Sequence, residues 1–435
     1  MTERFSFLPR PFRRLNPALV LFASVALAVG AAGCTEDLQG GTGCPTLCPT
    51  QSNEFRDTTI DAVVLDTSLA GFPTFGLSNG MVIANRKDTV ETVGIIRFDQ
   101  LPSTFSANGG STTDDITAVD SVYLSVRIDS TGGRGATQVD LLAYDVDSVG
   151  VSDPTAAQML AFFRPDRLIG KLSLTPTAAR DSLRIPLSKA AFFAKIKNQQ
   201  RLRIGLKIDG LVSGQIRIVA LNSGFASPVL SFDVPTDTIY SPIIVAPVTV
   251  IAGAASDALL AKTLYTLTRT APVEAGAQTL TVGGWPSHRS YLRFNVPSFI
   301  VDSSTVVRAE LLLTQRPSPG VDRTDSIAIV PLISTSTTLV TDIRRAIDLA
   351  AEGVFNGLDS LRLVPGDSGT KKLSVLPVVR TWAILPNNIF RAIVLRSSNE
   401  GAELGEARFY SSEGPAAFRP RLRITYLPRV DRAIP

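Results

Sequence analysis

Three cysteines and a single histidine are the residues of this chain with the most distinctive chemistry. The histidine, His288, lies in Gly283-Gly284-Trp285-Pro286-Ser287-His288-Arg289, a segment whose glycines and proline are typical of a turn. A Ser-His-Asp site would have to use this histidine as its base. We expect instead that His288 is an exposed loop residue in a turn before a strand.

Other signals of catalysis are weak. The sequence has no Gly-x-Ser-x-Gly elbow, no phosphate-binding glycine loop and no His/Cys cluster for a metal. Glu406 and Glu413 are candidates for paired carboxylates, but nothing in the sequence sets their separation. Asp114-Asp115 and Asp145-Val146-Asp147 lack the ligand spacing of an EF-hand calcium loop, so we expect turn residues. We predict no enzymatic activity, no cofactor and no metal site.

Cys34 follows a segment typical of protein export. Four arginines within residues 1–14 precede an uncharged apolar run, Ala18–Ala32, which is shorter than the about 20 residues of a membrane-spanning helix. The run ends in Ala31-Ala32-Gly33-Cys34 and resembles a bacterial lipobox, in which the cysteine thiol is acylated before cleavage. We predict a lipoprotein signal peptide at 1–33 and lipid attachment at Cys34. The alternative is an ordinary secretory signal followed by a chance cysteine.

Residues 34–53 are rich in Gly, Thr, Pro and Ser, which predicts a flexible tether. Within it, Cys44 and Cys48 are the two cysteines left in an oxidising compartment once Cys34 is lipidated. We expect a small disulfide loop, with two free thiols as the alternative. Thr35 stands where an aspartate would retain a lipoprotein in the inner membrane of enteric bacteria, which favours the outer membrane. The leaflet, periplasmic or cell-surface, stays open.

The basic charge of the chain belongs largely to the export segment. The formal net charge is +4. Four arginines and Glu3 within residues 1–33 account for three of these units, so the mature chain is close to neutral. A near-neutral protein has no broad cationic field for nucleic acid. We therefore predict no nucleic-acid partner.

Three aromatic residues with polar neighbours, Trp285, Tyr291 and Tyr410, are candidates for stacking on sugar rings. The aromatic content is only 7%, which is low for a strong sugar-binding protein. Trp382 follows Val378 and Val379 at helical spacing and is expected in the core. Trp285 is expected on an accessible loop.

A short strand motif occurs twice. Tyr291–Ser298 repeats Ile95–Ser103, and each copy has an Arg-Phe pair followed by a polar residue and a closing Pro-Ser. Alternation places Leu292 and Phe294 on one face of a strand, and the proline ends it. Further matches predict a duplicated, strand-rich chain: Val119–Val126 with Val307–Thr314, Val139–Tyr144 with Ile327–Leu332, Leu183–Leu187 with Leu373–Pro377, Arg203–Leu206 with Ala392–Leu395, and Arg217–Val234 with Arg408–Tyr426.

Helix signals are few. Asp153-Pro154 predicts the start of a short helix at Ala156–Phe163, and Ser188 predicts another that buries Phe192 and Ile196. Thr341–Ala351 has an apolar face and ends at a glycine, which predicts a third helix.

The second half resembles a known family. The residues that carry the resemblance are Val379-Arg380-Thr381-Trp382, Asn387-Asn388, Ile393-Val394-Leu395, Arg408–Glu413 and Arg419–Tyr426. They are similar to the helical turn, tryptophan and closing strands of the DNRLRE-type domain, a jelly-roll β-sandwich related to carbohydrate-binding modules and found on bacterial surface and secreted proteins. The resemblance covers about 280–427. The first half departs from it, because Ile218-Val219-Ala220-Leu221-Asn222 replaces the Phe-Tyr-Ser-Ser-Glu stretch.

We therefore predict an all-β fold of two tandem jelly-roll-like β-sandwich domains with a few short helices. The predicted domains are 54–235 and 245–430, joined near Pro235–Pro247. The predicted function is a non-catalytic cell-envelope lipoprotein for binding or surface display, with carbohydrate as the first ligand to test. The alternative is a structural or adhesion protein of the envelope that binds another protein. The predicted partners are the membrane, through the lipid, and a polysaccharide or an envelope protein.

Overall fold

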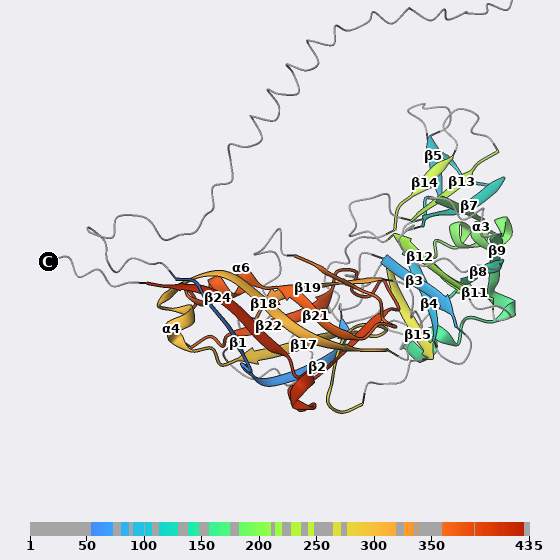
Figure 1. Ribbon diagram of the computed structural model, residues 1–435. Coiled ribbons are helices and arrows are strands. Elements are labelled where there is room, and N and C mark those ends of the chain that lie inside the picture. The colour runs from blue at the N-terminus through green and yellow to red at the C-terminus, as the bar shows by residue number, and fades with distance from the viewer. Residues whose placement is uncertain are drawn as a thin grey trace, which may run out of the picture. The chain divides into compact units, whose positions relative to one another are not determined.

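Antiparallel strands make up more than half of the chain that the computed structural model describes (Figure 1). Residues 55–435 form one compact unit, distinct from residues 1–54. The described residues are 54–72, 80–86, 90–99, 101–106, 113–128, 138–147, 156–174, 182–209, 214–219, 228–235, 242–247, 264–270, 276–318, 326–334, 337, 359–386 and 388–429. The predicted all-β sandwich fold is confirmed.

The first sandwich has a 7-stranded and a 4-stranded sheet. The larger runs β12-β3-β4-β11-β8-β9 with β15 added to β4, and the smaller runs β10-β7-β13-β14. These strands are β3 (Gly80–Asn85), β4 (Glu91–Phe98), β7 (Ser121–Arg127), β8 (Val139–Asp145), β9 (Leu168–Leu174), β10 (Ser182–Pro186), β11 (Leu202–Ile208), β12 (Gly214–Val219), β13 (Val229–Asp233), β14 (Ile243–Val245) and β15 (Leu264–Thr270). A separate hairpin joins β5 (Thr104–Ser106) and β6 (Thr113–Asp115).

The second sandwich is one 11-stranded arrangement, because β18 pairs with β23 and so connects its two layers. Its strands are β1 (Arg56–Ile60), β2 (Val63–Phe72), β16 (Thr279–Gly283), β17 (Ser287–Phe294), β18 (Ser304–Arg316), β19 (Ile327–Ile333), β20 (Leu361–Leu363), β21 (Gly369–Ser374), β22 (Ala392–Ser397), β23 (Glu406–Tyr410) and β24 (Arg421–Pro428). In the first sandwich the described connections between the layers are two isolated bridges, Ile128 to Ile218 and Gly170 to Leu187.

The two sandwiches are built on one pairing plan. Ile96 of β4 faces Ile204 of β11, as Leu292 of β17 faces Ile393 of β22. The neighbouring strand pairs agree as well. β11 pairs with β8 in the first sandwich in the same register as β22 pairs with β19 in the second. Equal registers follow from equal alternation, since a shift by one residue would turn every core side chain outward. The predicted duplication is confirmed.

Two of the predicted matches are out of register. Val122, Leu124 and Val126 point into the first core, whereas Ala309, Leu311 and Leu313 do so in the second. The match of Val119–Val126 with Val307–Thr314 is therefore shifted by one residue. Leu187 donates its N–H to Val122 at 2.9 Å, as Val375 donates to Ala309 at 2.9 Å. Leu187 is thus equivalent to Val375, and the match of Leu183 with Leu373 was two residues out.

Each sandwich has its own apolar core. Ile83, Phe98 and Phe232 are among the fully buried residues of the first, and Leu311, Phe409 and Ile424 among those of the second. The alternating burial of β7 and β24 shows how one apolar face of each strand enters the core.

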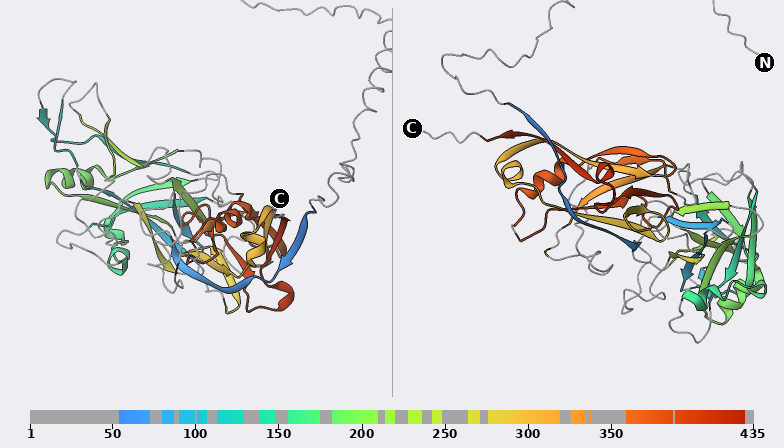
Figure 2. Two further views of the ribbon diagram at one scale, coloured as in Figure 1. Left: turned by 90° about the vertical axis from the view of Figure 1, so that its left-hand side faces the viewer. Right: turned by 60° about the horizontal axis from the view of Figure 1, so that its bottom comes forward.

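The first two strands of the chain belong to the second sandwich. β1 pairs with β24, and β2 pairs with β17 along its whole length. Figures 1 and 2 show these blue strands among the orange and red strands of the C-terminal half. Ala62, between β1 and β2, is buried in the second core. Ser68 bonds the hydroxyl of Ser290 at 2.8 Å and accepts the N–H of Thr281 at 2.9 Å.

The reverse exchange occurs in the first sandwich. β14 pairs with β13 as β1 pairs with β24, and β15 pairs with β4 as β2 pairs with β17. Both β15 and β2 carry an irregularity at the same step, between Thr268 and Thr270 and between Ala70 and Phe72. Each repeat therefore gives its two leading strands to the sandwich of the other repeat.

This exchange corrects the predicted domain boundaries. Residues 56–72 were assigned to the domain 54–235, and 264–270 to the domain 245–430, but each segment pairs in the other sandwich. Strand signals in a sequence are local, whereas the partner of an edge strand is set by which edge is left unpaired.

The described helices are short. α3 (Lys189–Lys197) begins at Ser188, whose Oγ accepts the N–H of Ala191, and it buries Phe192 and Ile196 as predicted. α2 (Ala156–Leu160) covers part of the predicted helix at Ala156–Phe163. The others are η3 (Pro165–Arg167), α4 (Ser298–Val301), α6 (Leu376–Trp382) and η6 (Ala416–Phe418). The helix predicted at Thr341–Ala351 lies outside the described residues, among which no helix is long and apolar enough to span a membrane.

A fragment test follows from the exchange. We expect residues 276–435 alone to lack cooperative unfolding, because the edges of β17 and β24 lose backbone partners worth about 0.5–1.5 kcal/mol per hydrogen bond. A synthetic peptide of residues 54–72 should restore a cooperative transition in circular dichroism, and a scrambled peptide should not. Equal thermal stability with and without the peptide would show that β1 and β2 contribute little.

Asp66 of β2 gives the exchanged strand a pH dependence. Burial raises the pKa of this carboxyl above its ordinary 3.8, although the N–H of Ser412 donates to it at 2.6 Å and acts in the opposite direction. The folded state therefore binds the proton more tightly than the unfolded state. The contribution of Asp66 to stability is full below pH 3.8 and is lost as the pH rises through the raised pKa. Urea unfolding of Asp66→Asn should lack this loss; an unchanged pH profile would contradict the assignment.

Candidate functional sites

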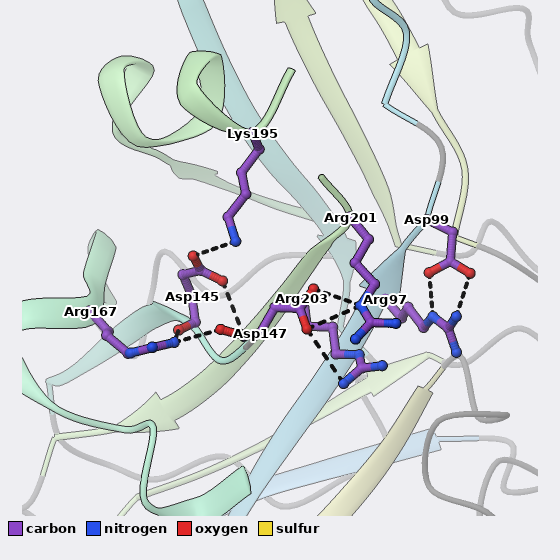
Figure 3. Close-up of polar contacts among 8 residues, drawn as sticks. All are labelled: Arg97, Asp99, Asp145, Asp147, Arg167, Lys195, Arg201 and Arg203. Atoms are coloured by element: carbon purple, nitrogen blue, oxygen red, sulfur yellow. Dashed lines mark hydrogen bonds and ion pairs between the residues drawn. The ribbon is translucent and has the colours of Figure 1, made fainter. Parts of the chain in front are cut away.

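Eight charged side chains gather at one end of the larger sheet of the first sandwich (Figure 3). They come from β4, the end of β8, η3, α3 and the start of β11, and we call them the charged network. Its members are Arg97, Asp99, Asp145, Asp147, Arg167, Lys195, Arg201 and Arg203.

Asp147 lies between two arginines. Its carboxylate accepts from Nε of Arg201 at 2.9 and 3.1 Å, and Nη1 of Arg203 lies 3.6 Å away (Figure 3). Arg201 and Arg203 share this position because alternation sends residues 201 and 203 to the same face, while Leu202 and Ile204 enter the core. The side chain of Arg203 is 2% exposed and that of Asp147 is 6% exposed. A guanidinium this deeply buried needs a counter-charge.

The segment Asp145–Asp147 presents oxygens of the kind that calcium prefers, but cationic side chains contact them. Nζ of Lys195 lies 2.8 Å from the carboxylate of Asp145. Nη1 of Arg167 donates to the carbonyls of Asp145 and Asp147 at 3.2 and 2.6 Å. Among the described residues there is no group of three or more Asp, Glu, His or Cys placed to hold a metal. The contacts assign these acids to holding the end of β8 against η3, α3 and β11.

Arg97, the arginine of the repeated motif, faces Arg203 directly across β4 and β11. Nε and Nη2 of Arg97 donate to both carboxylate oxygens of Asp99. Two adjacent buried guanidinium groups are therefore matched by different carboxylates, that of Asp99 for Arg97 and that of Asp147, shared with Arg201, for Arg203. Such pairs fix side-chain geometry, whereas removal of one partner is strongly destabilising.

Among the described residues, the equivalent positions of the second sandwich hold no such network. Arg293 takes the place of Arg97, and its guanidinium lies over the ring of Phe390, 3.5 Å from the ring centre. Ala392 takes the place of Arg203. The repeats thus share a backbone plan and differ in the chemistry of this face.

Trp285 is half-buried in the turn between β16 and β17. Gly283 and Gly284 have φ values of +78° and +82°, which glycine adopts without strain. The ring packs against Val82, Ala84, Val90 and Leu404, three of which belong to the first sandwich. Its apolar surface is therefore partly used within the chain: Trp285, which was expected on an accessible loop, lies in a turn but is half-buried.

The other stacking candidates are also covered. Tyr291 is only 6% exposed, which removes it as a sugar platform; it lies on β17 between β2 and β22. Tyr410 is half-buried and stacks on Phe418 with ring centres 4.9 Å apart and planes 24° apart. Arg316 lies over the Tyr410 ring at 4.8 Å. Phe418 is 42% exposed and is the more accessible ring of this pair.

Trp285 and Tyr410 do not form one platform. Gly283, next to the Trp285 turn, pairs with Glu406, whereas Thr279 at the other end of β16 pairs with Tyr410. Four residues of antiparallel strand separate these positions by about 14 Å.

The remaining sequence candidates fall in three places. Cys34, Cys44 and Cys48 lie outside the described residues. His288 lies within β17, not in a loop, and its Nδ1 is 3.3 Å from the carbonyl of Gly283. Glu406 is buried and bonded to Ser318 and Arg408, both at 2.6 Å, whereas Glu413 is exposed.

Trp382 is 3% exposed and packs on Phe294 with ring centres 5.5 Å apart, so its predicted place in the core is confirmed. Sequence reasoning missed the charged network. The available signal was an arginine within an apolar run, at Arg97 and again at Arg203.

Comparisons with known proteins give no family. No family model matches the chain, and no curated protein matches it. Among solved structures, the 2.6 Å structure of T=1 particles derived from infectious bursal virus is 12% identical, with 85% of this chain and 75% of that chain covered and a TM-score of 0.11. The IBDV T13 viral particle is 11% identical over 86% of this chain and 73% of that chain, with the same TM-score. At this TM-score the likeness supports no statement about fold or function.

The charged network yields a matched pair of variants. Asp147→Asn should destabilise the first sandwich by about 3–5 kcal/mol, because it removes a buried carboxylate that pairs with Arg201 and buried Arg203. Asp166→Asn removes a carboxylate that is 65% exposed and pairs with exposed Arg164, so it should change the free energy of unfolding by less than about 0.5 kcal/mol. Urea unfolding followed by circular dichroism measures both, and equal midpoints would contradict a structural role for Asp147.

Proposed function

We propose that this chain is a non-catalytic lipoprotein of a bacterial cell envelope whose two β-sandwiches form a binding or display module. Its anchor is the lipid on Cys34, and the expected membrane is the outer one. Residues 34–53 separate the anchor from the sandwiches. The basis for the anchor is the coincidence of a basic start, an apolar run and Ala31-Ala32-Gly33-Cys34.

The strand exchange is the observation that carries the display role. The tether leads directly into β1, so a pull on the anchor acts on the β1–β24 pairing of the second sandwich. β2 then runs along β17 before the chain enters the first sandwich at β3. Each sandwich thus holds two strands of the other repeat, which resists separation of the two repeats under load.

The aromatic side chains favour a protein partner over carbohydrate. Tyr291 is buried, and Trp285 packs within the chain. Sugar binding by stacking needs an exposed ring face, since stacking uses the ring's apolar surface. A protein ligand has no such requirement, because interfaces draw on loops and sheet faces as well.

Carbohydrate binding is the second candidate, and one observation favours it. Tyr410 and Phe418 stack on each other, and Phe418 is 42% exposed. This pair lies in the region that resembles the DNRLRE-type domain. A glycan array on the mature chain distinguishes the two candidates. Binding that disappears in Phe418→Ala but persists in Ile384→Ala, a change at an 81% exposed residue, would support the sugar and contradict the protein-partner proposal.

The anchor has its own test. Cys34→Ser should abolish labelling with a radioactive fatty acid and release the protein from the membrane fraction, since the acylated thiol is removed. Cys44→Ser is the matched control and should leave labelling and membrane binding intact. A Cys34→Ser protein that still takes up label and sediments with membranes would contradict the lipoprotein proposal.

A further inference from the structure

The contacts that hold β1 and β2 do not determine which molecule supplies these strands. All hydrogen bonds and ion pairs described for them go to the second sandwich. They join Asp57 to Arg423 and Thr425, Asp66 to Ser412, and Ser68 to Ser290 and Thr281. A second copy of the chain presents the same sandwich and therefore offers the same contacts.

The backbone pairing also does not depend on which copy of the chain supplies β1 and β2. β1 lies along the edge of β24, and β2 lies along the edge of β17 that β22 does not use. Strand edges pair with any chain that brings the right alternation. The register is fixed by side-chain alternation, which is identical in every copy.

The covalent link from β2 to β3 favours the chain's own strands. Residues 73–79 make this link, and seven residues span at most about 25 Å. A short link gives an effective concentration of about millimolar, so another copy must compete against that value.

The order of the chain weakens this advantage during folding. β1 and β2 are made first, whereas β16 to β24, which accept them, lie at the end of the sequence. Pairing between such distant segments is slow, because a long loop must close before any contact forms. A finished second sandwich of another copy is a competing acceptor during that time.

We propose that β1 and β2 of one copy fill the second sandwich of another copy. The partner of this surface is thus a second copy of the chain. Two reciprocal exchanges close a dimer in which every strand keeps the neighbours that it has in the monomer. The proposal does not depend on the lipid anchor.

Thr59 faces Arg423 across β1 and β24, which provides a direct test. The mature chain, with its three native cysteines changed to serine, is made in two forms, Thr59→Cys and Arg423→Cys. The two forms are mixed, unfolded in urea, refolded together and oxidised. Circular dichroism and size-exclusion chromatography first establish that each form folds.

The matched control uses two strands of one sandwich. Ser125 faces Arg184 across β7 and β10, neither of which is exchanged between the repeats. We expect the Thr59→Cys and Arg423→Cys mixture to yield several-fold more disulfide-linked dimer than a mixture of Ser125→Cys and Arg184→Cys. The yield should rise with protein concentration during refolding.

Two results would overturn the proposal. A dimer yield equal to that of the control, with the Thr59→Cys/Arg423→Cys double variant closing its disulfide within one chain, would show that exchange stays inside the molecule. A disulfide within one chain between Thr59→Cys and Ser231→Cys would place β1 where β14 lies on β13, in the first sandwich. That arrangement would return each repeat's leading strands to its own sandwich.

Discussion

The pairing of free strand edges is the constraint on which this structure depends. A turn joins β16 to β17, and the two strands pair with each other at Gly283 and His288. Beyond this pair, the edge of β17 that does not face β22 is open to a further strand. β3 and β4 pair at Ala84 with Thr92 and at Asn85 with Glu91, and an edge of β4 is then free as well. Buried backbone groups must find partners, so each edge requires a further strand. β2 and β15 supply these strands, with the same registers and the same irregularity.

The sequence predicted what local pattern determines. The Arg-Phe motif, the alternation of β7 and β24 and the cap at Ser188 all depend on residues close together in the chain. They predicted strands, a duplication and a helix, which the structure confirms. The exchange of β1 and β2 could not be predicted in this way, because both sandwiches offer an equivalent edge. A match by alternation also leaves the register uncertain by a residue or two, as the predicted matches of β7 with β18 and of β10 with β21 demonstrate.

The candidate sites also divide into features that nearby residues determine, which the sequence predicted, and features that distant residues determine, which it did not. Trp382 was assigned to the core from helical spacing, and that assignment depends only on one short segment. Trp285 was assigned to an open loop from its glycine and proline neighbours, which correctly predict the turn. Its exposure, however, depends on Val82, Ala84 and Val90, about 200 residues earlier in the chain. The charged network likewise joins Arg97 to Arg203 through strand pairing that composition does not reveal.

Duplication gives each repeat a different use of the same position. In the first sandwich Arg97 and Arg203 are buried, so each must be matched by a carboxylate, and the surrounding loops are held by these ion pairs. In the second sandwich, Ala392 stands at the position of Arg203, so Arg293 has no arginine opposite it. The guanidinium of Arg293 lies over the ring of Phe390. A cation over an aromatic ring stabilises by about 0.5–2 kcal/mol and requires no buried acid. Both sandwiches contain buried ion pairs, such as Arg289 with Glu400 in the second, but at this position the first places two buried arginines opposite each other and the second does not. The second sandwich is the one that receives the strands following the predicted anchor. The sandwich entered first along the described chain is thus the one built mainly from the later repeat, and the exchange of β1 and β2 makes it so.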